Sequence, residues 1–374
     1  MEEERRNEGQ ATGEEGGPPR KSRSWIRYAA AALAGVIAAY FLVFYPLPYY
    51  IYQPGSAEDI SPMITTAPGH PGDPGVFMLT TVGVLDANAV TYLWAKATHQ
   101  EIRPKKAVLQ GQSEEEYNQT QVYYMSSSQA SAILAAYHHL GIAFDYHVDS
   151  ILVLHLIPGM PAAKVLQVGD ELLKVDGQEL RKQDQLVNYL SGKKAGDHVT
   201  LTFKRGGETM EGGVSLDYLP AVAAPSGGKA EPRRVGMGIS QAIMMTVLSK
   251  EEQNRISIKA GEIGGPSAGL MFTLEIINRL LPEDIAKGHR IAGTGTIEEN
   301  GKVGSIGGIQ HKIVAADREK AEIFFAPKDE DGYTNYSDAL KEAQKIGTEM
   351  KVVPVGTLDE AIAYLKQLPV KTAP

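Results

Sequence analysis

The 374-residue sequence contains no cysteine, which excludes disulfide bonds, iron–sulfur clusters and cysteine-based zinc sites. This absence is compatible with any compartment, including an oxidising exterior in which free thiols are a liability. The formal net charge of −8 argues against a nucleic-acid partner. The zinc-binding pattern H-E-x-x-H is also missing, and the adjacent His138 and His139 would point in different directions on a helix. We therefore expect neither a metal nor a cofactor.

Charge is missing altogether from the stretch that begins at Tyr28 and ends at Ala57. Its apolar part, residues 28–48, would be about 31 Å long as a helix, which matches the hydrocarbon core of a bilayer. The tyrosines that gather towards its C-terminal end are typical of a membrane–water interface. The sequence thus predicts one transmembrane helix.

The charges on either side predict how this helix is oriented. Residues 1–27 are polar and end in a cluster of basic side chains, whereas the first lysine or arginine on the other side is Lys96. Because basic flanks remain in the cytoplasm, we expect residues 1–27 to form a disordered cytoplasmic tail and the catalytic part to lie outside the cell membrane. A cleaved signal peptide is the alternative, although the aromatic-rich segment 46–54 does not resemble a small-residue cleavage site.

The rest of the chain divides into four regions by composition. Residues 49–124 contain a proline-rich segment and read as an extracytoplasmic connector. Residues 125–218 predict a small β-rich domain, and the Pro-, Gly- and Ala-rich residues 219–234 predict a linker. Helical and strand patterns alternate in residues 235–374, which indicates an α/β or α+β domain. We therefore expect a multidomain protein.

The segment between the predicted anchor and the small domain contains several local patterns. They predict a strand at 76–84, a short helix at 87–99, a polar loop at 100–120 and an amphipathic helix with a serine cap at 126–140.

The sequence Gly-Gly-Pro-Ser-Ala-Gly at residues 264–269 is the first candidate for chemistry. Its glycines and proline predict a tight, exposed turn, and apolar residues from Leu270 to Leu281 then recur at helical spacing. Ser267 is expected at or near the N-terminus of this helix, where free backbone N–H groups could stabilise an oxyanion. The alternative is that Ser267 is only an N-cap.

Lys312 is the second candidate. Residues 290–297 predict a strand, residues 298–308 predict a glycine-rich hairpin, and Lys312 lies in the first turns of the helix that follows. A serine hydroxyl needs a nearby base, and a lysine can be that base only if burial lowers its pKa. A solvated surface lysine is the alternative. The neighbouring His311 suggests a Ser-His-Asp triad, but none of the nine histidines lies in a catalytic signature.

These two stretches together carry a family resemblance. The segment GGPSAGL, followed 45 positions after its serine by the lysine of GSIGGIQHK, resembles the proteolytic domain of the Lon family of serine proteases. The resemblance implies that Ser267 is the nucleophile and that Lys312 is its general base. Thr294 matches a family threonine that hydrogen-bonds near the lysine, with an exposed strand threonine as the alternative. Pro266 and Ala268 flank the serine and would support it.

Two features depart from the Lon family pattern. Many of its members carry an acidic residue just before Gly-Pro-Ser, where this chain has Gly264 and the nearest acid is Glu262. Lon proteases proper also carry an ATPase module. The P-loop pattern G-x-x-x-x-G-K-[ST] is absent here, and residues 295–302 contain only a lookalike that cannot make the phosphate cradle. We therefore predict activity without ATP.

The small β-rich region carries a second resemblance. The segments GMPAA and VGDELLKVDG and the closing strand at 199–204 look like a PDZ domain. PDZ domains bind extended peptides by strand addition, often with the terminal carboxylate on backbone N–H groups. By analogy, the groove is expected between the helix at 184–190 and a strand made of Gly141, Ile142, Ala143 and Phe144. A small β domain without a ligand is the alternative.

The order of transmembrane anchor, PDZ domain and Lon-like domain resembles the YlbL/SepM-like, PDZ-containing membrane proteases of bacteria. This resemblance implies a membrane-anchored serine endopeptidase that cleaves extracytoplasmic polypeptides, with the PDZ domain recruiting or gating substrate and a homo-oligomeric ring as its assembly. A non-catalytic PDZ scaffold at the membrane is the alternative. A transporter or channel is disfavoured because the sequence predicts only one span.

Overall fold

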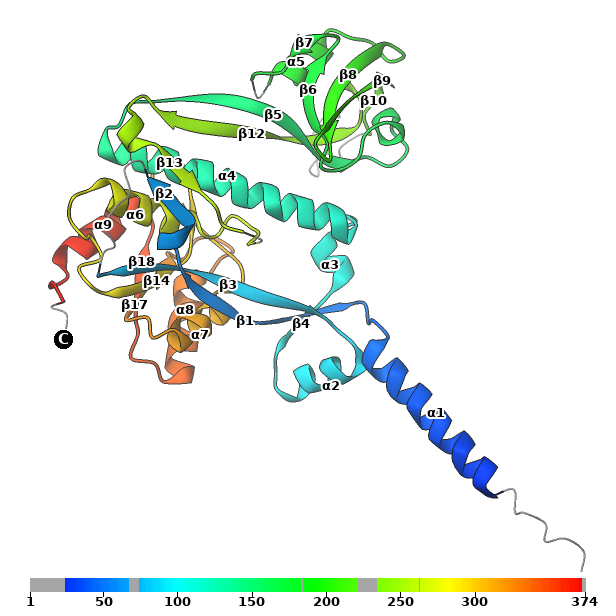
Figure 1. Cartoon of the computed structure of the whole chain (residues 1–374), viewed down its shortest axis with the longest axis vertical. Helices are drawn as coiled ribbons and strands as arrows, with labels where there is room; N and C mark the ends of the chain where they lie inside the picture. The colour runs from blue at the N-terminus through cyan, green and yellow to red at the C-terminus, as the bar shows by residue number, and fades with distance from the viewer. Residues whose placement is uncertain (1–23, 67–73, 183, 221–233, 262, 372–374) are drawn as a thin grey trace, which may run out of the picture.

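The computed structural model describes residues 24–66, 74–182, 184–220, 234–261 and 263–371. Figure 1 shows helix α1 (Ser24–Phe44) projecting from the folded part of the chain. The segment Trp25–Phe44 is long and apolar enough to cross a membrane, and it is fully exposed. The helix begins four residues earlier than the predicted 28–48 and ends at Phe44, because Pro46 and Pro48 cannot continue it.

A six-stranded mixed sheet forms the centre of the main body, which we define as residues 45–149 and 245–371. Its strand order is β18-β17-β14-β3-β1-β4, and β3, β14, β17 and β18 are mutually parallel. The strands are β1 (Tyr49–Asp59), β3 (Val76–Asp86), β4 (Glu101–Pro104), β14 (Arg290–Gly293), β17 (Ile323–Pro327) and β18 (Lys351–Val355). Residues 49–124 are therefore not a separate connector, since they supply half of the strands of this sheet.

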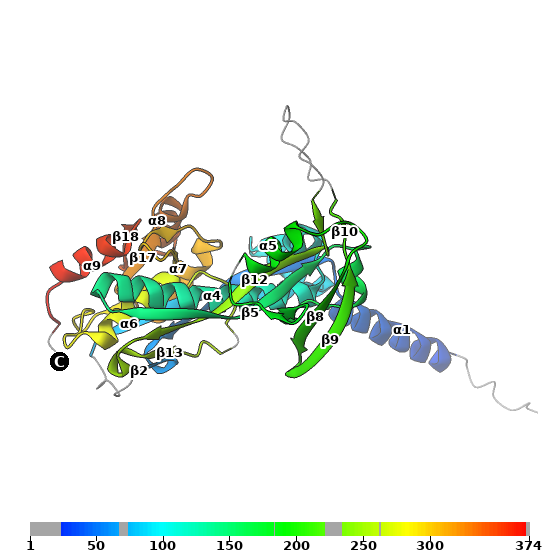
Figure 2. The same ribbon diagram turned by 90° about the horizontal axis from the view of Figure 1, so that it is seen from above.

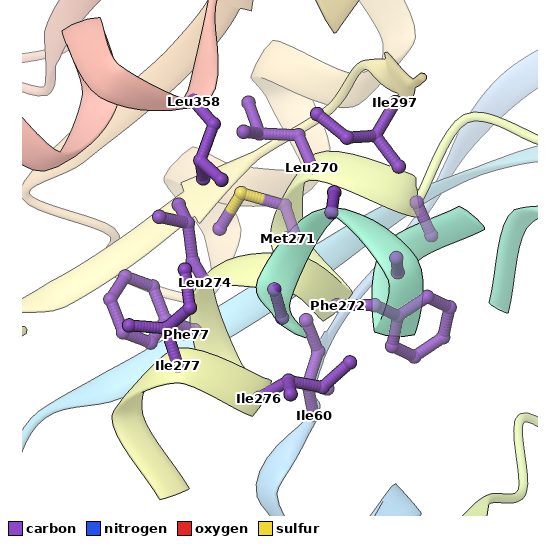
Figure 3. Close-up of a cluster of buried hydrophobic side chains, with 14 of the residues drawn as sticks. Ile60, Phe77, Leu270, Met271, Phe272, Leu274, Ile276, Ile277, Ile297 and Leu358 are labelled. Carbon is purple, nitrogen blue, oxygen red and sulfur yellow. The ribbon is translucent and has the colours of Figure 1, made fainter. Parts of the chain in front are cut away.

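Helices cover both faces of the sheet. Because successive side chains of a strand point to opposite faces, Phe77 and Leu79 pack in the core of one face, whereas Met78 packs in the core of the other. The first core also contains α4 (Glu114–Leu140), α6 (Gly269–Leu280) and α9 (Leu358–Gln367), and the second contains α7 (Ile309–Arg318) and α8 (Asn335–Ile346). Figure 3 shows α6 at the centre of the first core, where residues 269–278 are all buried.

Helix α4 corrects the prediction for residues 100–140. The predicted loop at 100–120 contains β4, α3 (Lys105–Leu109) and the first turns of α4. The helix begins after Ser113, whose side chain accepts from the backbone N–H of Glu116 in a reciprocal capping box. The polar first turns of α4 have no apolar repeat before Met125, so the periodicity did not indicate a helix there. Gly141, in the left-handed conformation, ends it.

A second sheet, of order β12-β5-β6-β8-β9, builds the small β domain, which we define as residues 150–244. Its elements are β5 (Phe144–Leu156), β6 (Glu171–Val175), α5 (Gln185–Ser191), β8 (His198–Arg205), β9 (Glu208–Ser215) and β12 (Ile239–Ser249). Strands β5 and β12 pair along their whole length and continue out of this domain onto the main body, where they lie against α4 (Figures 1 and 2). The two parts of the molecule are thus joined by a continuous two-stranded ladder.

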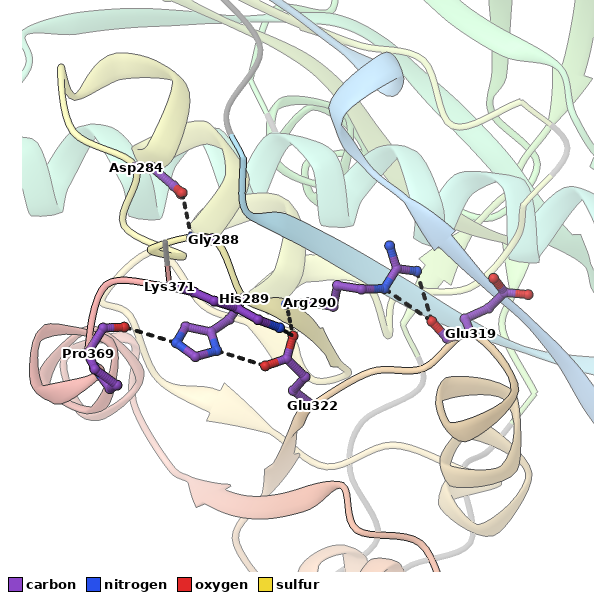
Figure 4. Close-up of polar contacts among 8 residues, drawn as sticks. All are labelled: Asp284, Gly288, His289, Arg290, Glu319, Glu322, Pro369 and Lys371. Carbon is purple, nitrogen blue, oxygen red and sulfur yellow. Dashed lines mark hydrogen bonds and ion pairs between the residues drawn. The ribbon is translucent and has the colours of Figure 1, made fainter. Parts of the chain in front are cut away.

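Polar contacts hold the C-terminal segment to the main body (Figure 4). The Glu322 carboxylate accepts from Lys371 Nζ at 2.7 Å and lies 2.9 Å from Nδ1 of His289. Burial opposes ionisation of Glu322, but these contacts and the backbone N–H of Arg290 lower its pKa to about 2. The carboxylate therefore stays charged and anchors the end of the chain beside β14.

Candidate active site

Ser267 lies in the turn that leads into α6. The helix begins at Gly269 with Ala268 as its N-cap, and the cap makes no side-chain hydrogen bond. Ser267 is therefore not the N-cap that the alternative reading requires. Gly269 is needed at the start of the helix because a Cβ atom there would meet Ile297, 2.8 Å from its side chain and 3.0 Å from its backbone nitrogen. Ser267 is half-buried and lines a cleft of the main body.

Lys312 approaches this serine from the opposite face of the sheet. It lies on α7, and its side chain is only 3% exposed. Its Nζ donates to Ser267 Oγ at 2.9 Å, to the carbonyl oxygen of Thr80 at 2.7 Å and to Thr294 Oγ1 at 3.1 Å. Because β14 ends at Gly293, the lysine from α7 and the serine before α6 meet beyond its carboxyl end. The surface reading of Lys312 is thus wrong.

Burial also sets the charge of this lysine. Desolvation lowers the pKa of Lys312 from its ordinary value of 10.5 to about 7. Its hydrogen-bond partners among the described residues are three oxygens without a formal charge. A substantial fraction of the amine is therefore neutral at physiological pH and able to accept a proton. Glu262, the acid closest to the motif in sequence, lies outside the described residues.

Thr294 joins the serine and the lysine. It is fully buried, and its hydroxyl donates to the carbonyl oxygen of Ser267 at 2.9 Å while it accepts from Lys312 Nζ. The backbone N–H of Gly295 donates to the same carbonyl at 2.8 Å. The exposed-strand reading of Thr294 is therefore wrong, and its side chain fixes the backbone of Ser267 relative to the amine.

We expect Thr294→Val to reduce cleavage by about 10- to 100-fold, because the shape is kept but both hydrogen bonds are lost. The Ser267 carbonyl would keep its hydrogen bond from the backbone N–H of Gly295, so the free energy of unfolding should fall by only about 1–2 kcal/mol. Steady-state kinetics should show the loss mainly in kcat. The variant Thr294→Ser keeps the hydroxyl and should retain most of the parent activity. Equal losses in the valine and serine variants would show that packing of the methyl group matters more than the hydroxyl.

Helix α4 supports the turn before the serine from the other side. The backbone N–H of Gly265 donates to the carbonyl oxygen of Gln121 at 2.9 Å, and Ser128 Oγ donates to the carbonyl oxygen of Pro266 at 2.9 Å. Ala268 is buried in the core against which α4 packs. Sequence reasoning missed Gln121 and Ser128, as well as Thr80. Two of these three contribute backbone carbonyls, which leave no signal in the sequence.

His311 faces away from this serine–lysine pair. Its Nε2 lies 3.1 Å from a carboxylate oxygen of Glu101 on β4, and Gln310 donates to the same oxygen at 2.8 Å. Ser267 Oγ, in contrast, is paired with Lys312. The geometry therefore gives no support to a Ser-His-Asp triad, and the histidine instead links α7 to the edge strand of the sheet.

A cleft of about 1030 Å³ opens beside Ser267 and Lys312. Leu79 and Met125 contribute an apolar part of its wall, and Arg103 contributes charge. Strand β3 also borders the cleft. Its residues 76–79 pair with β14, but beyond them β3 has β1 as its only partner among the described strands. One edge of β3 next to the serine is therefore left without a strand neighbour.

The structure does not place the predicted peptide-binding strand, residues 141–144, beside α5. Gly141 ends α4, residues 142–143 are not in a strand, and Phe144 begins β5 at the end that packs on the main body. The four residues 141–144 therefore cannot form a groove with α5. A cavity of about 540 Å³ lies instead between α5 and residues 234–241, with Leu186, Leu190, Met237 and Ile239 in its wall. The strand beside α5 thus comes from a segment far from α5 in the sequence, and such distant pairing leaves no local pattern.

A serine beside a buried lysine in an α/β body, joined to a small β domain, defines the class of this protein. Residues 239–367 match the model of the Lon protease (S16) C-terminal proteolytic domain, and residues 139–216 match the PDZ domain model. The chain therefore combines a PDZ domain with the serine-type proteolytic domain of the Lon family. This confirms the predicted fold class, in which an apolar N-terminal helix precedes these two domains.

Several Lon proteases are similar to part of this chain. The Lon protease of Metamycoplasma arthritidis is 39% identical over 101 residues, which cover 27% of this chain and 11% of the relative. That of Chloroflexus aggregans is 32% identical over 115 residues, which cover 30% of this chain and 13% of the relative. The chain thus spans little more than a tenth of the length of these relatives. Among solved structures, the PDZ domain of an SdrC-like protein from Listeria monocytogenes is 26% identical and covers 25% of this chain and 87% of that chain, with a TM-score of 0.21.

Proposed function

We propose that this protein is an ATP-independent, membrane-anchored serine endopeptidase in which Ser267 is the nucleophile and Lys312 is the general base. The observation that carries the proposal is the 2.9 Å contact between Lys312 Nζ and Ser267 Oγ at a buried amine. A serine becomes a useful nucleophile when a positioned base can take its proton. A desolvated lysine with a pKa of about 7 meets that requirement.

The contacts of Lys312 suggest the order of proton transfers. The neutral amine takes the proton of Ser267 as Oγ attacks the scissile carbonyl carbon. The resulting ammonium ion is stabilised by the oxygens of Thr80 and Thr294, and it then gives its proton to the leaving amine of the peptide. Backbone N–H groups at the start of α6 would stabilise the oxyanion. Water then hydrolyses the acyl-enzyme by the same steps.

The open edge of β3 suggests how a polypeptide reaches the serine. An extended chain that paired with residues 81–84 would form backbone hydrogen bonds with the open edge of β3 and run along the cleft. Its alternate side chains would point to opposite faces, and those on one face would meet the wall formed by Leu79 and Met125. We therefore propose unfolded or extended polypeptides as substrates.

Helix α1 would span the membrane with the N-terminus in the cytoplasm, so that the cleft lies outside. The groove between α5 and residues 234–241 would bind a peptide and so recruit or gate substrate, and β12 leads from it to the main body. From the family resemblance we also infer a homo-oligomeric ring.

The test is cleavage of an unfolded model protein by the full chain in detergent or nanodiscs, without nucleotide, beside Ser267→Ala. We expect the parent to cleave and the variant to lose at least about 10³-fold with unchanged circular dichroism. Equal activity of the variant would exclude Ser267 as nucleophile. Cleavage that required added ATP would overturn the ATP-independent part, and no cleavage by either chain would favour a scaffold.

A further inference from the structure

Helix α2 (Ala89–Ala97) leaves an apolar face uncovered. Its side chains Val90, Leu93 and Trp94 are 50%, 65% and 51% exposed. Residues spaced three and four apart share one side of a helix, so these three side chains form a single surface. The opposite side is packed, since Ala95 is buried and the ring of Tyr92 contacts that of Tyr49 in a tilted arrangement with centroids 5.1 Å apart. The helix is therefore held firmly with its apolar face outward.

This face lies where the chain leaves α1. The backbone N–H of Leu47 donates to the carbonyl oxygen of Ala87 at 2.7 Å, and that of Ala87 donates to Tyr49 at 3.0 Å. These bonds join the segment after α1 to the segment before α2, and the two helices are in contact. Figure 1 shows α2 beside the end of α1 that meets the folded part of the chain. Val84 and Leu85, which are also exposed, lie at the end of β3, a few residues before α2.

We propose that α2 lies in the membrane–water interface beside α1, with Val90, Leu93 and Trp94 inserted among the lipid headgroups and upper acyl chains. This inference rests on the proposed role of α1 as a transmembrane anchor. Tryptophan, leucine and valine on the outward side of a short helix suit this boundary, while the other side of α2 packs on the protein. Lys96 lies at the margin of the face, and its Nζ lies 5.2 Å from the centroid of the Tyr92 ring, so its charge is turned towards the packed side of the helix.

A lipid surface fits this face better than a protein partner does. Three side chains on a nine-residue helix are small beside the roughly 800 Å² that each partner buries in a stable protein interface. The bilayer would already be present at the end of α1, so that no further partner is required. Attachment at both α1 and α2 would restrict rotation of the main body about the α1 axis and hold the cleft at a set height above the membrane.

Fluorescence can test this because the chain contains only two tryptophans, Trp25 at the start of α1 and Trp94 in α2. The full chain with Trp25→Phe is reconstituted into phosphatidylcholine–phosphatidylglycerol vesicles, with or without bromine on the acyl chains. We expect bromine near the headgroups to quench Trp94 emission by about half, and bromine deep in the acyl chains to quench it less. The matched chain with Trp94→Phe reports Trp25, and hence whether α1 is in the bilayer.

A third chain provides the negative control. It carries Trp25→Phe and Trp94→Phe together with Tyr146→Trp, which places the only tryptophan at a 63% exposed site on β5 and should show no quenching. Quenching of Trp25 without quenching of Trp94 would overturn the inference and leave the anchor intact. If neither Trp25 nor Trp94 is quenched, both the inference about α2 and the proposed membrane anchor are overturned. Trp94 emission that is blue-shifted yet insensitive to bromine would mean that protein covers this face, which also overturns the inference.

Discussion

Replacing Lys312 with methionine is expected to lower the rate of peptide-bond cleavage at pH 8 by about 10³-fold or more. Methionine fills the buried site with a chain of similar length, but it cannot take the proton of Ser267. The variant should remain folded, because it removes an amine whose burial is unfavourable when charged. Lys345→Met, at a lysine side chain that is 71% exposed, is the matched control and should cleave at the parent rate.

The pH dependence of the parent enzyme follows from the same amine. Because burial lowers the pKa of Lys312 to about 7, the neutral form that the proposed mechanism requires is lost as pH falls through 7. Activity should therefore rise from pH 6 to pH 8 with a midpoint near 7. A pH profile that is flat over this range, or a Lys312→Met chain that still cleaves at pH 8, would place the base elsewhere.

The stability of the parent should respond to pH in the same direction. In the unfolded chain Lys312 regains its ordinary pKa of 10.5, so the unfolded state binds more protons between pH 7 and pH 10.5. The free energy of unfolding of the parent, relative to Lys312→Met, should rise by about 1.4 kcal/mol for each pH unit in this window. Below pH 7 the difference should become constant. Urea unfolding of both chains at pH 7 and pH 9 measures this difference in the free energy of unfolding.

The second large effect is expected in the PDZ domain, on replacing Arg205 with methionine. Asp170 is 1% exposed, and its carboxylate accepts from Arg205 Nε at 2.8 Å and from Arg205 Nη2 at 2.7 Å. Removing the guanidinium would leave a buried carboxylate with the backbone N–H of Gln167 as its remaining donor among the described residues. We expect the domain to lose about 3 kcal/mol of stability.

Hydrogen exchange in the full chain can measure this loss by domain. Protection of the backbone amides in β6 and β8 should fall by about 100-fold, whereas the amides of β14 and α6 should change little. The double variant Arg205→Met with Asp170→Leu should recover much of the protection, because it removes the unpaired charge. If Arg205→Met alone leaves β6 and β8 unchanged, the ion pair does not stabilise the domain.

The sequence alone predicted the parts of this protein that local pattern encodes. The uncharged run after residue 27 predicted a span, and the spacing of apolar residues after Gly269 predicted α6. The two motifs singled out Ser267 and Lys312 through their resemblance to the Lon proteolytic domain. Their catalytic roles remain a proposal, while the Lon and PDZ domains are confirmed.

Tertiary structure decided what surrounds these residues. The backbone carbonyl of Thr80 accepts a hydrogen bond from Lys312 Nζ beside the serine. The turn before α6 is supported by α4, whose polar first turns read as a loop. One wall of the cavity beside α5 comes from residues 234–241, well separated in sequence from that helix. Backbone groups are alike at every residue, and pairing between distant strands depends on the whole chain. Such contacts leave no local pattern, and for that reason the surroundings of the serine and the lysine could be known only from the folded molecule.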